Sequence, residues 1–326
     1  MSGIIVRVVA IALFVTGHGV MMAPALAEYP DAPIRLVIPF ASGSATDTSA
    51  RIYATALSRQ FSQQVVPDNR PGAGGTIGME LVARAAPTGY TIGYAGAGPL
   101  AINRSVSEKL PYDVDKDFAP ISQANETPLM LAVSPSLPVK TLKELIALAR
   151  SRPGQLSNGS SGTGTIGYLA GELFKVMTDT RIEHIPYKGG AQAAIDVMAG
   201  RVQLIFDPSN GISPFVKSGK LHGLAVTGYR RLTAFPEIPT VAESGVPGFE
   251  VTTWGGLIAP AGVPPVIIAR LSQEMRIAAA SRFVKESYEP LGAEPRAGTP
   301  GEFTALIRRD AAKWADVMRR AEINAK

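Results

Sequence analysis

The sequence predicts an α/β protein of two lobes joined by two crossing segments. Short apolar runs suited to buried strands alternate with stretches of helical periodicity, which is typical of a mainly parallel sheet covered by helices. Two longer extended runs, residues 118–133 and 250–259, lack helical periodicity and interrupt that alternation. A chain that crosses into a second lobe usually returns, so we expect the two runs to form a hinge. The expected lobes are residues 28–126 with 251–326, and residues 127–250.

The first lobe opens with strands and helices in alternation. Residues 34–39 (IRLVIP) form a continuous apolar run, and the helix expected next has one apolar face, made of Ile52, Tyr53, Ala56, Leu57 and Phe61. Thr46 or Asp47 is the expected cap of this helix. A strand, a turn-rich link, a helix, a further strand and a small-residue loop are then expected, at residues 64–67, 69–75, 76–85, 90–95 and 96–99.

The second lobe repeats this alternation around one stretch of small residues. Ser157 to Glu172 (SNGSSGTGTIGYLAGE) begins as a loop of Gly, Ser and Thr, and from Gly167 its apolar residues recur at the period of a helix. Upstream, Thr141 and Glu144 form a capping box that opens a helix. The later elements expected here are strands at 183–186, 202–206 and 221–227, a helix ending at residue 198, and a loop at 207–210 followed by a short helix.

Three helical stretches follow the second crossing and should complete the first lobe. They run from about Pro265 to Ala280, from Arg282 to about Leu291, and onward from Thr299. At Thr299 a capping box coincides with a proline at the first helical position, which is a strong helix start.

Residues 1–27 have the features of a secretory signal peptide. Arg7 is their only charge, residues 4–20 are largely apolar, and Ala25-Leu26-Ala27 ends in the small-x-small pattern that signal peptidase needs. We therefore expect cleavage after Ala27 and a periplasmic mature chain; the alternative is a retained N-terminal anchor. No later stretch approaches the roughly 18 consecutive apolar residues that cross a bilayer.

Composition excludes several classes of function. The chain has no cysteine, which removes disulfides, thiol nucleophiles, cysteine-ligated metals and a lipidated N-terminal cysteine. The formal charge of +5 falls to +4 without Arg7, and the basic residues are scattered, so no nucleic-acid partner is expected. The two histidines after residue 27, His184 and His222, have no carboxylate cluster beside them, and no metal site is expected.

Two enzyme signatures are approached but not met. Residues 162–167 match G-x-G-x-x-G, yet Glu183 stands at the start of the following strand, where a dinucleotide site needs an acidic residue near its end. Residues 159–163 miss the nucleophile motif G-x-S-x-G by one position. We therefore expect no cofactor and no catalytic residues.

Small-residue loops stand where the expected strands end and helices begin. The first four N–H groups of a helix lack intrahelical partners, and the aligned peptide dipoles place about half a positive charge there, so such ends attract anions. One such loop would be only a capped turn, but five are expected to open on one cleft and hold the two ends of a small organic acid: 40–47, 96–99, 160–165, 187–190 and 207–210. The residues expected to bind it are Phe40, Ser42, Gly43, Ser44, Thr46, Asp47, Gly98, Ser160, Ser161, Thr163, Gly164, Thr165, Tyr187 and Asp207.

Several short motifs occur in order along the mature chain. They include Pro39-Phe40 with Gly43, Thr46 and Asp47, then residues 69–75 (NRPGAGG), 110–113 (LPYD), 160–162 (SSG), 169–172 (LAGE), 186–189 (PYKG) and 238–245 (IPTVAESG). With these motifs the chain resembles the Bug-type solute receptors that serve tripartite tricarboxylate transporters. The resemblance implies a type II periplasmic binding protein fold whose lobes close on a carboxylated solute, held by the loops at 40–47 and 160–165.

The chain departs from the family pattern beside both loops. Family members commonly have Pro-Ala at positions 41 and 42 and Gly-Gly at 44 and 45, where this chain has Ala-Ser and Ser-Ala. Positions 166 to 168, often Ser-Ser-His, are Ile166, Gly167 and Tyr168. The added apolar and aromatic surface suggests a bulkier or aromatic acid as ligand.

The expected function is a monomeric receptor without a cofactor. It captures a mono- or dicarboxylate between its lobes and delivers it to the membrane permease subunits of a tripartite tricarboxylate-type transporter. Two alternatives stay open on sequence alone: an exported α/β enzyme that acts on a small organic acid, and a sensory receptor that presents its ligand to a membrane kinase.

Overall fold

The structure is a computed structural model that describes residues 29–107 and 109–320. The expected signal peptide and its cleavage site lie outside the described residues. Within them, none of the helices combines the length and the apolar character that a membrane crossing needs.

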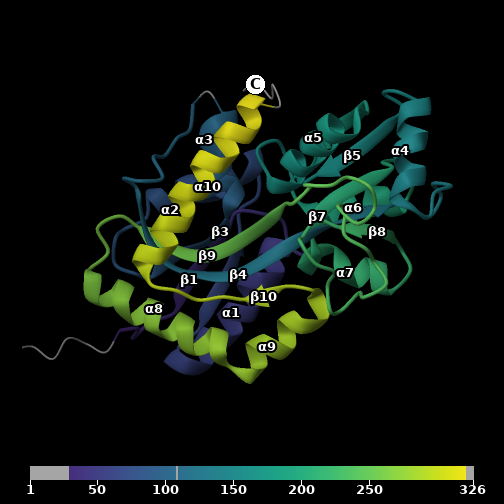
Figure 1. Cartoon of the computed structure of the whole chain (residues 1–326). Helices are drawn as coiled ribbons and strands as arrows, with labels where there is room; N and C mark the ends of the chain where they lie inside the picture. The colour runs from purple at the N-terminus through teal and green to yellow at the C-terminus, as the bar shows by residue number, and fades with distance from the viewer. Residues whose placement is uncertain (1–28, 108, 321–326) are drawn as a thin grey trace, which may run out of the picture.

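In the described residues, ten strands form one sheet (Figure 1). Eight follow one another in the order β2-β1-β3-β9-β4-β7-β5-β6, and β8 and β10 both pair with β4. The pairs that β1 makes with β2 and β3 are parallel, and so are those of β5 with β6 and β7. The strands are β1 (Ile34–Ile38), β2 (Val65–Asn69), β3 (Thr91–Gly96), β4 (Phe118–Val133), β5 (Leu156–Ser160), β6 (Ile182–Pro186), β7 (Leu204–Pro208), β8 (His222–Val226), β9 (Thr252–Pro260) and β10 (Glu294–Pro295).

The antiparallel strands β4 and β9 join the two parallel groups. β4 pairs with β9 over residues 118–128 and then with β7 and β8 over residues 129–133. Just before β9 begins, the N–H of Val251 donates to the carbonyl of Thr227 at the end of β8. The expected extended runs are thus strands that pass from one group to the other, while the lobe boundaries stay a prediction.

Helices cover both faces of the sheet (Figure 1). Successive side chains of β1 point to opposite faces of the sheet. Ile34, Leu36 and Ile38 belong to a buried cluster that includes residues of α1, α8 and α9. Val37 belongs to the cluster on the other face, which includes residues of α2, α5 and α10. The helices are α1 (Ala45–Phe61), α2 (Thr76–Ala83), α3 (Asn103–Val106), α4 (Leu142–Ser151), α5 (Ile166–Thr178), α6 (Gly190–Met198), α7 (Ser209–Lys217), α8 (Pro265–Ala280), α9 (Arg282–Tyr288) and α10 (Pro300–Arg320).

Two of the expected helix caps are confirmed and one is wrong. The capping box of Thr141 and Glu144 is present at the start of α4, and Thr299 and Glu302 exchange the equivalent bonds at the start of α10. The cap of α1 is Ser44, whose hydroxyl accepts from the N–H of Asp47, so Thr46 and Asp47 lie inside the helix. Ser44 can cap because the preceding Gly43 has φ +79°, which turns the chain into the helix.

Three segments expected as loops have regular structure instead. Residues 157–160 belong to β5, since this strand is buried between β6 and β7 and tertiary pairing overrides its polar composition. Residues 97–106 are helical from Ala97 onward, and Gly98–Ile102 form a π-helical turn. At 207–210 there is no loop, because β7 runs through Pro208 and α7 begins at Ser209.

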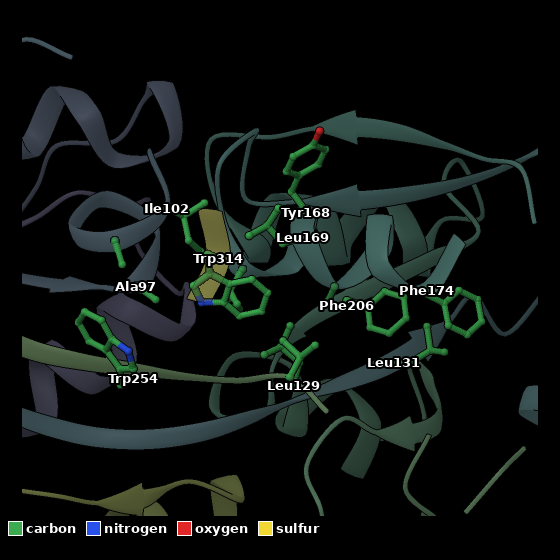
Figure 2. Packing of buried hydrophobic residues seen from close by; sticks show 14 of the residues in the cluster. Ala97, Ile102, Leu129, Leu131, Tyr168, Leu169, Phe174, Phe206, Trp254 and Trp314 are labelled. Atoms are coloured by element: carbon green, nitrogen blue, oxygen red, sulfur yellow. The ribbon is translucent and has the colours of Figure 1, made fainter. Parts of the chain in front are cut away.

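One buried cluster contains residues from both groups of parallel strands, β1 and β3 in one group and β5, β6 and β7 in the other. Figure 2 shows Leu129 and Leu131 of β4 with Phe206 of β7, Leu169 and Phe174 of α5, and Trp314 of α10. These side chains fix α5 and the end of β7 to the crossing strand, which places the helix starts that follow.

Candidate functional site

A pocket lies where four helices begin. It holds about 620 Å³ of space between protein atoms, part of it open to solvent. Its walls come from the starts of α1 (Ser44, Ala45, Thr46), of the helical run at 97–106 (Ala97, Gly98, Pro99), of α5 (Thr165, Ile166, Gly167) and of α7 (Pro208, Asn210). Helix starts expose N–H groups and positive dipole ends, so this pocket is suited to an anion.

The crossing strands supply the rest of the pocket wall. Asn125 and Thr127 of β4 and Thr253 and Trp254 of β9 line it, and none of them was among the expected site residues. Tyr94 of β3 donates to Asn125 Oδ1 at 2.6 Å, and Asn125 Nδ2 donates to Thr127 Oγ1 at 2.6 Å. This chain of bonds fixes the polar groups that face the pocket from the side of the sheet.

Asn210 joins two of the helix starts directly. Its Nδ2 donates to the carbonyl of Ala45 at 2.9 Å and to the hydroxyl of Ser49 at 2.8 Å. Its Oδ1 is buried and has no hydrogen-bond partner among the described residues. Because an unsatisfied buried acceptor is costly, this oxygen is a candidate to receive a hydrogen bond from a water or a ligand.

The carboxylate of Asp47 organises the loop before α1. It accepts from the N–H of Gly43 at 2.8 Å, from Nε of Arg51 at 2.9 Å and from Nδ2 of Asn69 at 2.9 Å. Burial alone would raise the pKa of Asp47, but the hydrogen bonds from Arg51, Gly43 and Asn69 together lower the pKa below its ordinary value. Asp47 is therefore ionised at neutral pH. Its carboxylate accepts the hydrogen bonds that hold the loop together and does not line the pocket.

Ser160 has a comparable role in the loop before α5. Its hydroxyl lies 2.6 Å from Nε2 of His184 and accepts from the N–H of Gly162 at 3.1 Å. Thr165 adds a bond from its hydroxyl to the carbonyl of Gly162 at 2.7 Å. The loop is thus closed by its own side chains, and Ser161 is left to face the pocket.

The pocket brings together half of the expected site residues. Phe40, Ser44, Thr46, Gly98, Ser161, Thr165 and Asp207 line it, whereas Ser42, Gly43, Asp47, Ser160, Thr163, Gly164 and Tyr187 do not. Of the five expected loops, the one at 187–190 does not line this pocket, although Gly190 lies beside Asp207. Tyr187 and Lys188 line another hollow with Thr163, and the phenol of Tyr187 donates to Asp196 at 2.7 Å. Whether any of these residues binds a ligand stays a prediction.

Two residues of α5, Ile166 and Tyr168, depart from the family pattern, and only one of them lines the pocket. Ile166 lines the pocket, while Tyr168 is buried outside it with its ring 4.6 Å from that of His184. The apolar surface added beside a ligand is therefore that of Ile166.

The electrostatics of the pocket come from backbone and neutral side chains. Of the described residues that line it, none is a lysine, an arginine or a histidine, and Asp207 alone can carry a formal charge near neutral pH. Among the described residues no group of three or more His, Cys, Asp or Glu could hold a metal ion. The arrangement can bind an anion through peptide N–H groups and hydroxyls.

Comparisons with known proteins identify the family and the fold. The family described as "Tripartite tricarboxylate transporter family receptor" matches residues 49–323. BugT of Bordetella pertussis is 35% identical over 310 residues, which is 95% of this chain and 95% of BugT. Among solved structures, R. palustris Rpa4515 with adipate has a TM-score of 0.90 at 36% identity and covers 92% of this chain and 100% of its own. The periplasmic binding protein BugD has a TM-score of 0.88 at 31% identity and covers 91% and 100%.

These matches extend over most of the chain and agree with the α/β fold. The fold is that of the two-lobe periplasmic binding proteins. The family consists of solute-binding receptors, so the alternative of an exported enzyme is set aside. This chain belongs to the tripartite tricarboxylate transporter receptor family, the TctC or Bug family.

Proposed function

We propose that this chain is a monomeric periplasmic receptor that captures a small mono- or dicarboxylate and delivers it to the permease subunits of a tripartite tricarboxylate-type transporter. The observation that carries the proposal is a pocket made of helix starts without a basic side chain. A hydrogen bond to a charged group contributes about 1.5 to 3 kcal/mol net, and micromolar binding requires about 8 kcal/mol. Three or four such bonds from N–H groups and hydroxyls reach that figure when each contributes about 2 to 3 kcal/mol.

In this proposal the ligand lies between lobes made of residues 28–126 with 251–326 and residues 127–250. Several close contacts join those two parts at the pocket. A Cβ added to Gly98 would lie 3.4 Å from the carbonyl of Gly164, and Asn210 Nδ2 donates to the carbonyl of Ala45. Contacts made in the closed form alone shift the equilibrium toward closure, so closure signals that the pocket is occupied.

A thermal-shift screen of residues 28–326 against organic acids tests the function. A ligand at a hundred times its Kd stabilises the native state by about 2.7 kcal/mol, which for a protein of this size raises the Tm by about 5 °C. We expect adipate or a related acid to give such a shift, and the uncharged diamide of the same acid to give none. Equal shifts from acid and diamide, or no shift from any acid, would contradict the function.

The same protein allows the source of ligand preference to be tested. We expect Ile166→Ser to change the ranking of acids by chain length, because Ile166 lines the pocket, and Tyr168→His to leave the ranking unchanged, because Tyr168 packs outside it. Isothermal titration of both variants with acids of four to eight carbons measures the ranking. A changed ranking in the Tyr168 variant with an unchanged one in the Ile166 variant would reverse the assignment.

A further inference from the structure

A carboxyl group sits in a pocket that is otherwise suited to an anion. Asp207 lines the pocket at the end of β7, and only 3% of the residue is exposed. Its carboxyl group has one hydrogen bond among the described residues, a long one from the hydroxyl of Ser161 at 3.5 Å. The two glycines beside it leave room for its oxygens: a Cβ on Gly190 would lie 2.4 Å from Oδ1, and a Cβ on Gly211 would lie 2.6 Å from Oδ2.

In the part of the chain that the structure describes, no Lys, Arg or His side chain forms an ion pair with this carboxyl group. The charged groups of the elements packed around it are engaged elsewhere: Asp47 of α1 with Arg51, Glu126 of β4 with Arg296, Glu172 of α5 with Lys175, Asp196 of α6 with Arg201, and Lys217 of α7 with the carbonyl of Pro290. Tyr94, the other titratable group of the pocket, stays a neutral phenol because burial raises its pKa.

An ionised Asp207 would repel the anion that the helix starts attract. Burial raises the pKa of Asp207 to about 7, and the hydrogen bond from Ser161 opposes this only in part. A carboxylate bound in the same pocket adds a like charge, which disfavours the ionised form further. Near neutral pH the free protein therefore exchanges between the two forms, and the complex favours the protonated one.

We propose that Asp207 binds the ligand as a neutral carboxylic acid that donates its proton to a ligand carboxylate, so that capture takes up one proton from solution. This inference rests on the proposed function and adds to it that a protonated side chain takes part in binding the ligand carboxylate. Binding should weaken as pH rises, because ionised Asp207 must first be protonated; with a pKa of about 7 the loss of affinity from pH 6.5 to 8.5 is about 25-fold.

Isothermal titration of residues 28–326 with adipate, or with the acid that gives the largest thermal shift, tests the proposal. Titrations at pH 8 in phosphate and in Tris, whose ionisation enthalpies differ, report the number of protons exchanged. We expect uptake of about 0.9 proton per ligand at pH 8. In Asp207→Asn, whose amide has the same shape and does not titrate, we expect binding to persist with no proton uptake and with a nearly flat pH dependence.

Binding to the wild-type protein without proton uptake and without pH dependence would overturn the proposal. If Asp207→Asn also lost binding in that case, an ionised Asp207 would be accepting a hydrogen bond from a donor on the ligand.

A measurement without ligand separates failure of this proposal from failure of the function. The free energy of unfolding of the wild-type protein, compared with that of Asp207→Asn, should fall as pH rises from about 4 to 7 and stay level above, because the pKa of Asp207 is higher in the folded state than in the unfolded state. If that fall is seen and no acid binds, the receptor function fails. If acids bind and the fall is absent, the assignment of Asp207 fails.

Discussion

Gly74→Ala is expected to weaken carboxylate binding about 10- to 100-fold while the protein still folds. Gly74 lies before α2, and a Cβ on it would come within 2.5 Å of the carbonyl oxygen of Thr163, in the loop before α5. These residues belong to different proposed lobes. The added methyl would therefore oppose closure, and overpacking of a rigid contact costs about 1 to 3 kcal/mol. Isothermal titration with the acid found by thermal shift measures the loss.

Gly219→Ala is the matched control for this variant. Gly74 has φ +60° and Gly219 has φ +71°, so alanine is strained at both positions, but no atom lies within 4 Å of the Cβ that Gly219 would gain. Both variants should lose a similar amount of stability, and only Gly74→Ala should lose affinity. Equal affinity in the two variants would mean that the contact between Gly74 and Thr163 has no part in ligand capture.

Sequence alone predicted much of the fold because the signals involved are local. The apolar run of β1, the capping boxes of α4 and α10 and the long extended run of β4 each depend on neighbouring residues, and each is confirmed. The polar residues of β5 predict a loop, because their strand conformation depends on parallel pairing with β6 and β7. Such pairing between distant segments leaves no periodic signal within five residues.

The sequence predicts the part of the pocket that is formed by helix starts. It does not predict the part that is formed by the crossing strands β4 and β9. Ser44, Ser161 and Thr165 line the pocket because small and hydroxyl residues mark helix starts. Asn125 and Thr127 could have been noticed as polar residues within the expected β4 run. Their position beside β9 depends on a register that contains two irregularities, between Pro120 and Ser122 and between Gln123 and Asn125, and no local pattern gives that register.

Trp314→Ala is expected to lower the free energy of unfolding by about 3 to 5 kcal/mol. Trp314 is 1% exposed and belongs to the buried cluster that Figure 2 shows, near Ile102 of the helical run at 97–106 and Leu129 of β4. Its removal leaves a cavity where α10 packs on the crossing strand, and the surrounding backbone can collapse into such a cavity only in part. Urea denaturation of residues 28–326, followed by circular dichroism, measures the change.

Trp314→Phe separates the loss of volume from the loss of a polar group. Nε1 of Trp314 is buried without a hydrogen-bond partner among the described residues, and an unsatisfied buried donor costs about 1 to 3 kcal/mol. Phenylalanine keeps an aromatic ring, so it leaves a smaller cavity than alanine does. It also removes the unsatisfied donor, and this gain offsets part of the cost of the cavity. The free energy of unfolding should therefore fall by less than about 2 kcal/mol. If Trp314→Phe destabilised the protein as much as Trp314→Ala, the indole N–H would have to be bonded in solution, and the ring alone would not account for the packing of α10 on β4.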